Sequence, residues 1–184
     1  MKTNVISRSL HDVGLSAWFG GTLANAVALN RAASAASDAR STGAVSNAGW
    51  DAWTPVNAVA IGAHLVGSVG QLLGNSQRIA GQQGVGTMSV VKTVVTVAAL
   101  GATGYSRVLG RKVSDHGAVP AASGTEPAAS TPPEVAKAQQ QLQLLQWVIP
   151  ALTGTLLVIS SYAGEQQRPT SVLSGVTDRL GIGR

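Results

Sequence analysis

Residues 54–75 of the chain read TPVNAVAIGAHLVGSVGQLLGN and contain no charged side chain. The charge-free run around them extends from Asp51 to Arg78, with 26 residues in between. A bilayer has a hydrocarbon core about 30 Å thick, which takes about 20 helical residues at 1.5 Å each. The stretch therefore predicts a helix that crosses a membrane.

Three further windows of this kind are bounded by charged residues and nearly free of charge inside. They hold 18 residues between Asp12 and Arg31, 28 between Arg78 and Arg107 with Lys92 among them, and 27 between Lys137 and Glu165. We predict spans near 13–31, 54–75, 88–109 and 143–163, and hence an all-α four-helix transmembrane bundle in one domain. Lys92 lies about one turn inside the third span, from which its long stem can reach the interface.

The overall composition favours the same class. Charged residues make up 11 % of the 184 residues, against about 25 % in a soluble domain. Phe occurs once and Gly 22 times. Small residues allow helix backbones to approach each other closely in lipid, so the chain is predicted to be a multi-pass protein of the cell membrane with the lipid bilayer as its surroundings.

Several functional classes are not expected. The chain has no cysteine, which excludes disulfides, cysteine-bound zinc and iron–sulfur clusters. Its net charge of +5 is scattered rather than clustered, so a nucleic-acid partner is not predicted and the basic residues suit anionic headgroups. The only methionines are Met1 and Met88, too few for copper transport. Because no two carboxylates fall in or beside one span together, we predict no enzyme activity, cofactor or metal.

The second span has two kinds of residue on one side. Small residues recur at three- and four-residue steps, which places them on one face of a helix; they are Ala60, Ala63, Gly67, Gly70 and Gly74. Asn57, His64 and Gln71 recur every seven residues beside that face. The polar groups fit either hydrogen bonds between helices, worth about 0.6 kcal/mol each in membranes, or a polar pathway or ligand site at mid-depth.

The first span also carries a ridge of small residues, which includes Gly21, with Asn25 close to it. We predict that the first two spans pack ridge to ridge, with Asn25 near His64 or Asn57. The candidate intramembrane polar site is then Asn25, Asn57, His64, Gln71 and Lys92. An alternative for this segment is a cleaved signal peptide, since residues 33–35 read Ala-Ser-Ala after a basic start and an apolar stretch.

Haem ligation needs two axial ligands at one depth. His64 lies near the middle of the second span, whereas His11 precedes the first span. This placement separates them by about 15 Å in depth, so bis-histidine ligation is not expected.

The connections differ in composition. Residues 32–49 are predicted to be a flexible loop, and the Pro/Ala/Ser-rich residues 114–133 a disordered loop before the fourth helix. That helix is predicted to begin at Pro133. Residues 169–184 fit an amphipathic helix at the membrane interface or a frayed tail. Four spans place both termini on one side; since a disordered loop is easily tolerated outside, we predict cytoplasmic termini.

Four segments of the sequence have a recognisable pattern, at residues 10–21, 47–50, 53–57 and 105–110. In these segments the chain resembles a group of uncharacterised actinobacterial four-span membrane proteins, and the likeness covers about 8–113 and much of the fourth span. The element Trp18-Phe19-Gly20-Gly21 is also similar to one in copper-resistance D membrane domains. The resemblance implies a four-span fold and carries no activity.

Two functions remain open on these grounds. The small-residue ridges and the lack of catalytic groups favour a structural or accessory protein that binds other membrane proteins or a second copy of itself. The polar positions favour a transporter or permeation protein for a small solute or a lipid.

Overall fold

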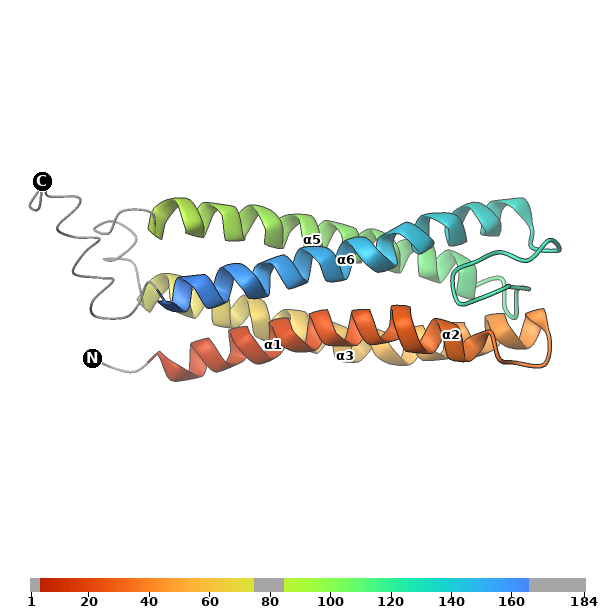
Figure 1. The fold of residues 1–184 in the computed structure, drawn as a ribbon, viewed down its shortest axis with the longest axis horizontal. Coiled ribbons are helices and arrows are strands. Elements are labelled where there is room, and N and C mark those ends of the chain that lie inside the picture. The colour runs from red at the N-terminus through yellow and green to blue at the C-terminus, as the bar shows by residue number, and fades with distance from the viewer. Residues whose placement is uncertain (1–3, 75–84, 166–184) are drawn as a thin grey trace, which may run out of the picture.

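The computed structural model describes residues 4–74 and 85–165, and those residues form a bundle of long helices with no strand (Figure 1). Helix α1 (Val5–Ala24) continues through a π-helical turn, η1 (Asn25–Leu29), into the short α2 (Asn30–Ala33). The other helices are α3 (Ala39–Gly74), α5 (Val85–Ser114) and α6 (Pro133–Glu165). The predicted all-α, four-helix architecture is confirmed, as is the helix start at Pro133. The tail 169–184 lies outside the described residues.

The helices are arranged as two antiparallel hairpins. Helix α1 lies along α3, and α5 lies along α6; the two pairs meet mainly through α1 and α6 (Figure 1). Helices α3 and α5 make little contact with each other. The start of α1 and the end of α6 lie at the same end of the bundle. Which side of a membrane that end faces remains a prediction.

Three of the described helices, α3, α5 and α6, are long and apolar enough to cross a membrane, which fits a membrane protein. With 36 residues, α3 is about 54 Å long, so it extends beyond a hydrocarbon core of about 30 Å. The last three predicted spans therefore lie within longer helices, the second of them as far as Gly74, where the described part of α3 ends. Helix α1 is not among the three, and a span there remains a prediction.

Helices α1 and α3 approach closely because glycines face the partner backbone. A Cβ atom at Gly14 would lie 2.5 Å from the carbonyl oxygen of Ala60, and one at Gly67 would collide with the backbone of Ser7 and His11. Gly70 and Gly74 likewise meet Ser7 and Asn4, and Gly21 meets the ring of Trp53. These three glycines of α3 thus face α1, but they meet Asn4, Ser7 and His11, and Gly21 meets a tryptophan, so these contacts are not the expected pairing of one small-residue ridge with another.

The expected neighbours of Asn25 are wrong. Gly21 meets Trp53 and Leu29 meets Gly49, so Asn25 lies between these levels, about one to two turns from Asn57 along α3. His64 contacts His11 instead. The error has a simple source: the sequence defines the ridge of each helix but not the register at which two ridges meet.

Residues 32–49 are not a flexible loop. Helix α2 ends at Ala33 and α3 begins at Ala39, so only five residues connect them. Asp38 caps α3: its side chain accepts hydrogen bonds from the backbone of Arg40 and Ser41, at 2.9 and 3.0 Å, and from the Ser41 hydroxyl at 2.7 Å. Capping satisfies amide groups that the first turn leaves free, and it allows a Ser/Ala-rich stretch to start a helix.

The expected disorder of 114–133 is also wrong, because this segment packs over one end of the bundle. Val119 is 4 % exposed and joins a cluster with side chains of α5 and α6. The Ser46 hydroxyl of α3 donates to the carbonyl of Gly124 at 2.9 Å, and the amide of Ala121 donates to the carbonyl of Ala39 at 2.9 Å. Composition alone could not reveal these partners, since they are supplied by the ends of helices far away in the chain.

The close approach of α1 and α3 predicts a contrast between two glycines of α3. Gly67→Ala should lower the stability of the protein in detergent by about 1–3 kcal/mol, because the added carbon forces the backbones apart. A Cβ atom at Gly62 would have no other atom within 4 Å. Gly62→Ala should therefore leave stability unchanged or raise it by about 0.5–1 kcal/mol. Thermal unfolding followed by circular dichroism checks both, and equal stability of the two variants would contradict the packing.

The cap of α3 predicts a dependence on acid. Hydrogen bonds, above all from the Ser41 hydroxyl, lower the pKa of Asp38 from 3.8 to about 2. Since the folded-state pKa is the lower one, the ionised cap stabilises the fold fully above about pH 4, and this contribution is lost as the pH falls toward 2. The midpoint of thermal unfolding should fall more between pH 6 and pH 3 for the wild type than for Asp38→Asn, which caps without ionising. An equal fall in both proteins would argue against the cap.

Candidate functional site

A cavity of about 340 Å³ lies between α3, α5 and α6, toward the end of the bundle that residues 114–133 cover. Its walls are residues 46–61 of α3, 100–114 of α5 and 139–149 of α6, with Thr22 of α1 and Gly124 and Thr125 of the covering segment. Exposed residues on both α3 and α5 belong to the lining, so the cavity reaches the surface between these two helices; they are Asp51, Ala58 and Gly104.

The cavity exists because α5 presents small residues where it faces α3. Gly104 and Gly110 line it, and neither has another atom within 4 Å of where a Cβ atom would lie. Protein interiors are otherwise packed as densely as organic crystals. The weak contact between α3 and α5 therefore reflects a defined cavity rather than loose packing along both helices.

Five buried polar atoms without a hydrogen-bond partner belong to residues of this lining. Two are donors, Trp53 Nε1 and Arg107 Nε; two are acceptors, Asn57 Oδ1 and Gln139 Oε1; the last is the hydroxyl Thr103 Oγ1. Each such atom costs about 1–3 kcal/mol when left without a partner. All five atoms are buried, so a molecule in the cavity can reach them only when side chains of the lining move.

An ion pair joins α3 and α5 at the edge of the cavity. Arg107 Nη1 lies 2.8 Å from Asp51 Oδ1, and the Ser114 hydroxyl donates to Asp51 Oδ2 at 3.3 Å. Asp51 and Arg107 are both lining residues. Their opposite charges balance, so the edge of the cavity carries no net charge from this pair.

Partly buried hydrogen bonds from Asn30 of α2 connect the α3 and α6 walls of the cavity. Trp50 Nε1 donates to Asn30 Oδ1 at 3.0 Å, and Asn30 Nδ2 donates to Gln146 Oε1 at 2.5 Å. Trp50 and Gln146 both line the cavity. Unlike Asn57, the Asn30 amide uses both its donor and its acceptor.

The structure divides the predicted polar residues among several places. Asn57 lines the cavity, and Asn25 is in the π-helical turn with its Nδ2 atom buried and unpartnered. His64 and Lys92 lie together near the other end of the bundle, and Gln71 lies half-buried one heptad beyond His64 on α3. These residues therefore do not form a single site.

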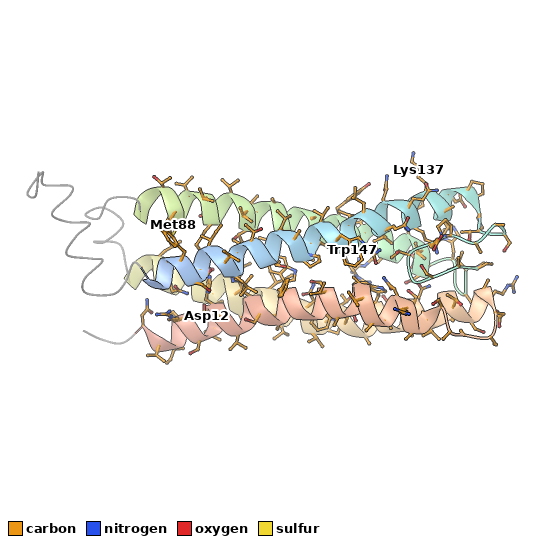
Figure 2. The ribbon with its side chains drawn as sticks, viewed as in Figure 1. Asp12, Met88, Lys137 and Trp147 are labelled. Carbon is orange, nitrogen blue, oxygen red and sulfur yellow. The ribbon has the colours of Figure 1, made fainter. Side chains whose placement is uncertain are left out.

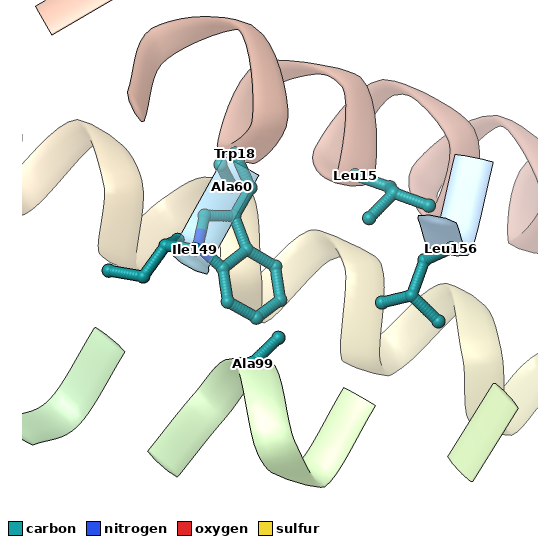
Figure 3. Packing of buried hydrophobic residues seen from close by; sticks show 6 residues of the cluster. All are labelled: Leu15, Trp18, Ala60, Ala99, Ile149 and Leu156. Atoms are coloured by element: carbon teal, nitrogen blue, oxygen red, sulfur yellow. The ribbon is translucent and has the colours of Figure 1, made fainter. Parts of the chain in front are cut away.

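An apolar layer separates the cavity from a second polar region, which consists of His11, His64 and Lys92. Its members come from all four long helices and point toward one another in the centre of the bundle (Figure 3): Leu15, Trp18, Ala60, Ala99, Ile149 and Leu156. Trp18 is completely buried. The members of the layer lie between the cavity and the residues around His64.

The second polar region corrects the predicted depths of the histidines. The ring centroids of His11 and His64 are 4.6 Å apart, whereas the sequence analysis placed them about 15 Å apart in depth. Helix α1 begins at Val5 rather than near residue 13, so His11 is inside the helix and lies level with His64 on the antiparallel α3. Two rings this close are in contact and leave no space between them for a porphyrin.

Sequence reasoning missed most residues of both regions. His11 precedes the predicted first span, yet it is 1 % exposed. Gln139 precedes the predicted fourth span and is not among the predicted site residues, and it is 2 % exposed. A signal for His11 was available: Leu15 and Trp18 follow it at helical spacing, which places all three on one buried face.

Comparisons of the chain with protein-family models, curated protein sequences and solved structures find no match. The resemblance to actinobacterial four-span proteins therefore remains a prediction.

The two buried asparagines predict opposite results for the same substitution. Asn57→Leu should leave the thermal stability in detergent unchanged or raise it, because Asn57 Oδ1 has no partner to lose. Asn30→Leu should lower stability by about 1–3 kcal/mol, because it leaves Trp50 Nε1 and Gln146 Oε1 without their hydrogen-bond partner. If Asn57→Leu were the more harmful change, the cavity would be a structural feature rather than a site.

Proposed function

We propose that the protein binds a small amphiphilic molecule, with an uncharged hydrogen-bonding head and an apolar chain, in the cavity between α3 and α5. One observation carries this proposal: five of the buried polar atoms without a partner belong to the lining of one cavity. Polar groups left unpaired at a stability cost suit a binding site better than a structural core.

The size and lining of the cavity support a ligand of this kind. Its volume of about 340 Å³ is at the lower end of the range of about 300–1,000 Å³ found for ligand pockets. Apolar side chains, among them Ile61, Leu100 and Ile149, surround the polar groups. The opening between α3 and α5 would let the remainder of an acyl chain extend into lipid.

The charge at the site favours an uncharged head. Arg107 already has Asp51 as its ion partner at 2.8 Å, so an anionic head would have to displace a carboxylate. The unpaired atoms include both donors and acceptors, which matches hydroxyl or amide groups. A head of that type can bond to Trp53 and to Asn57 or Gln139 at once.

The apolar layer around Trp18 favours binding over permeation. A solute in the cavity would meet Trp18 and its neighbours before it could reach the other end of the bundle. An accessory role, the other function that the sequence suggested, remains a prediction. That role was motivated by small residues of α3, among them Gly67, Gly70 and Gly74. These glycines pack against residues 4–11 of the same chain, so they do not support a contact with another protein.

A brominated probe tests the proposal, because bromine quenches nearby tryptophan and both Trp50 and Trp53 line the cavity. The full-length protein in lipid nanodiscs is titrated with 1-decanoylglycerol brominated on its acyl chain. We expect saturable quenching of tryptophan fluorescence. Gly104→Leu should weaken the apparent affinity at least about tenfold, because the leucine would fill the cavity at a position with no neighbouring atom to clash with.

Gly101→Leu is the matched control. Gly101 is on the same helix, has equally open surroundings and does not line the cavity, so this variant should quench as the wild type does. Brominated decanoate should bind less tightly than the glycerol ester. Quenching that rises linearly with concentration, or that is alike in both leucine variants, would mean simple partitioning into lipid and would refute the proposal.

A further inference from the structure

Three ionisable side chains form a hydrogen-bonded chain at the end of the bundle far from the cavity. Lys92 Nζ lies 3.3 Å from His11 Nε2, and His11 Nδ1 lies 2.7 Å from Asp12 Oδ1. His11 thus stands between an ammonium group on α5 and a carboxylate, both within hydrogen-bond distance of its two ring nitrogens.

The chain leads from the interior of the bundle to its surface. The side chain of His11 is 2 % exposed, whereas that of Asp12 is 51 % exposed. Figure 2 shows Asp12 near the end at which α1 begins, opposite to the end that carries Lys137. The carboxylate is therefore exposed at the surface of the bundle, whereas the imidazole is enclosed.

The position of Lys92 differs from that of a lysine that snorkels. Such a side chain follows the outside of its own helix to the interface. Lys92 instead reaches from α5 to α1, which are diagonal neighbours, since α5 packs on α6 and α1 packs on α3 and α6. Ionisable groups placed inside a membrane bundle are costly and tend to be functional.

Other charged and titratable groups around His11 are few in the part of the chain that the structure describes. Helix α1 adds Arg8, which lies 3.6 Å from Asp12 and is 57 % exposed. Helix α3 adds the His64 ring at 4.6 Å. Helix α6 approaches Arg8 with Gly164. Arg8 thus holds Asp12 from the solvent side, and Lys92 is the cation on the inner side.

The bonding partners define where the protons are. Lys92 carries only donors and an ionised carboxylate only accepts, so Nε2 of His11 accepts from Lys92 and Nδ1–H donates to Asp12. We propose that His11 relays protons between the interior Lys92 and the aqueous surface, with Lys92 as the site that holds the proton. This inference is independent of the cavity and its ligand.

The relay step conserves protons and leaves the imidazole neutral. The Lys92 ammonium transfers one proton to His11 Nε2, while the proton on Nδ1 passes to Asp12. Asp12 then releases it to water. The same steps in reverse, in which Asp12 takes up a proton from water, passes it to Nδ1, and Nε2 returns its proton to Lys92, restore the starting arrangement. The net result is that Lys92 gains or loses one proton without direct contact with bulk water.

Nitrogen-15 NMR of histidine-labelled protein in nanodiscs tests the relay. At neutral pH the wild type should show His11 neutral and protonated at Nδ1. Asp12→Asn keeps an oxygen that accepts from Nδ1–H but cannot take up a proton, so exchange of this ring proton with water should be at least about tenfold slower. A purely structural network would behave in the opposite way, because a weaker bond opens more often and exchanges faster.

Three controls accompany this measurement. Asp12→Glu should restore fast exchange, and Arg8→Gln, which alters only the solvent-side partner, should leave it fast. His116, which is in the 114–133 segment, gives an internal reference in each sample, and its signals should be the same in the wild type and in every variant. Lys92→Met should raise the midpoint of His11 protonation, because the neighbouring ammonium group is gone.

Either of two results would overturn the relay. One is unchanged or faster exchange in Asp12→Asn with the fold intact by circular dichroism. The other needs no variant: a wild-type His11 that is protonated at Nε2 rather than Nδ1 at neutral pH cannot accept from Lys92.

Discussion

The close contact between α1 and α3 determines the position of every other feature. Lipid supplies no hydrophobic drive for two apolar helices to associate, so packing and hydrogen bonds must hold them together. Gly14 and Gly67 permit that packing because each faces the backbone of the other helix. The same contact places His11 beside His64 and Gly21 beside Trp53. The bundle is thus built on one tight helix pair, to which α6 and α5 are added.

The second hairpin is held differently, and this difference creates the site. Helix α6 packs on both α5 and α1, while α5 barely touches α3. Where a fourth tight contact would be expected, Gly104 and Gly110 leave a space, and the polar groups around it are unpaired. A layer centred on Trp18 then divides the interior into this cavity and the cluster of His11 and Lys92. Two polar regions can coexist in one small bundle because an apolar layer insulates each from the other.

The errors of the sequence analysis concern connections and register. Residues 114–133 lack the apolar content that predicts order. They are nevertheless ordered by hydrogen bonds to Ser46 and Ala39, which lie near the start of α3 and far away in the sequence. Residues 39–49 look like a loop because serine and alanine are not distinctive, and the capping role of Asp38 became evident only from its bonds to Ser41. The predicted depth of His11 is wrong because the charge of Asp12 was used as the boundary of the first span, whereas α1 begins at Val5 and carries Asp12 on an exposed face.

The number of long helices, their approximate centres and the face of α3 that turns inward can be read from the amino-acid sequence alone. They follow from charge-free length and from the spacing of Ala60, Gly67 and Gly70, which are local properties and do not depend on neighbouring helices. Which residues meet depends on the tertiary structure. Asn57 and His64 are on one face of one helix, yet one lines a cavity and the other contacts a histidine of α1. The physical reason is that periodicity reports the direction in which a side chain points, whereas its partner depends on how far one helix slides along another, and that is settled by packing across the whole interface.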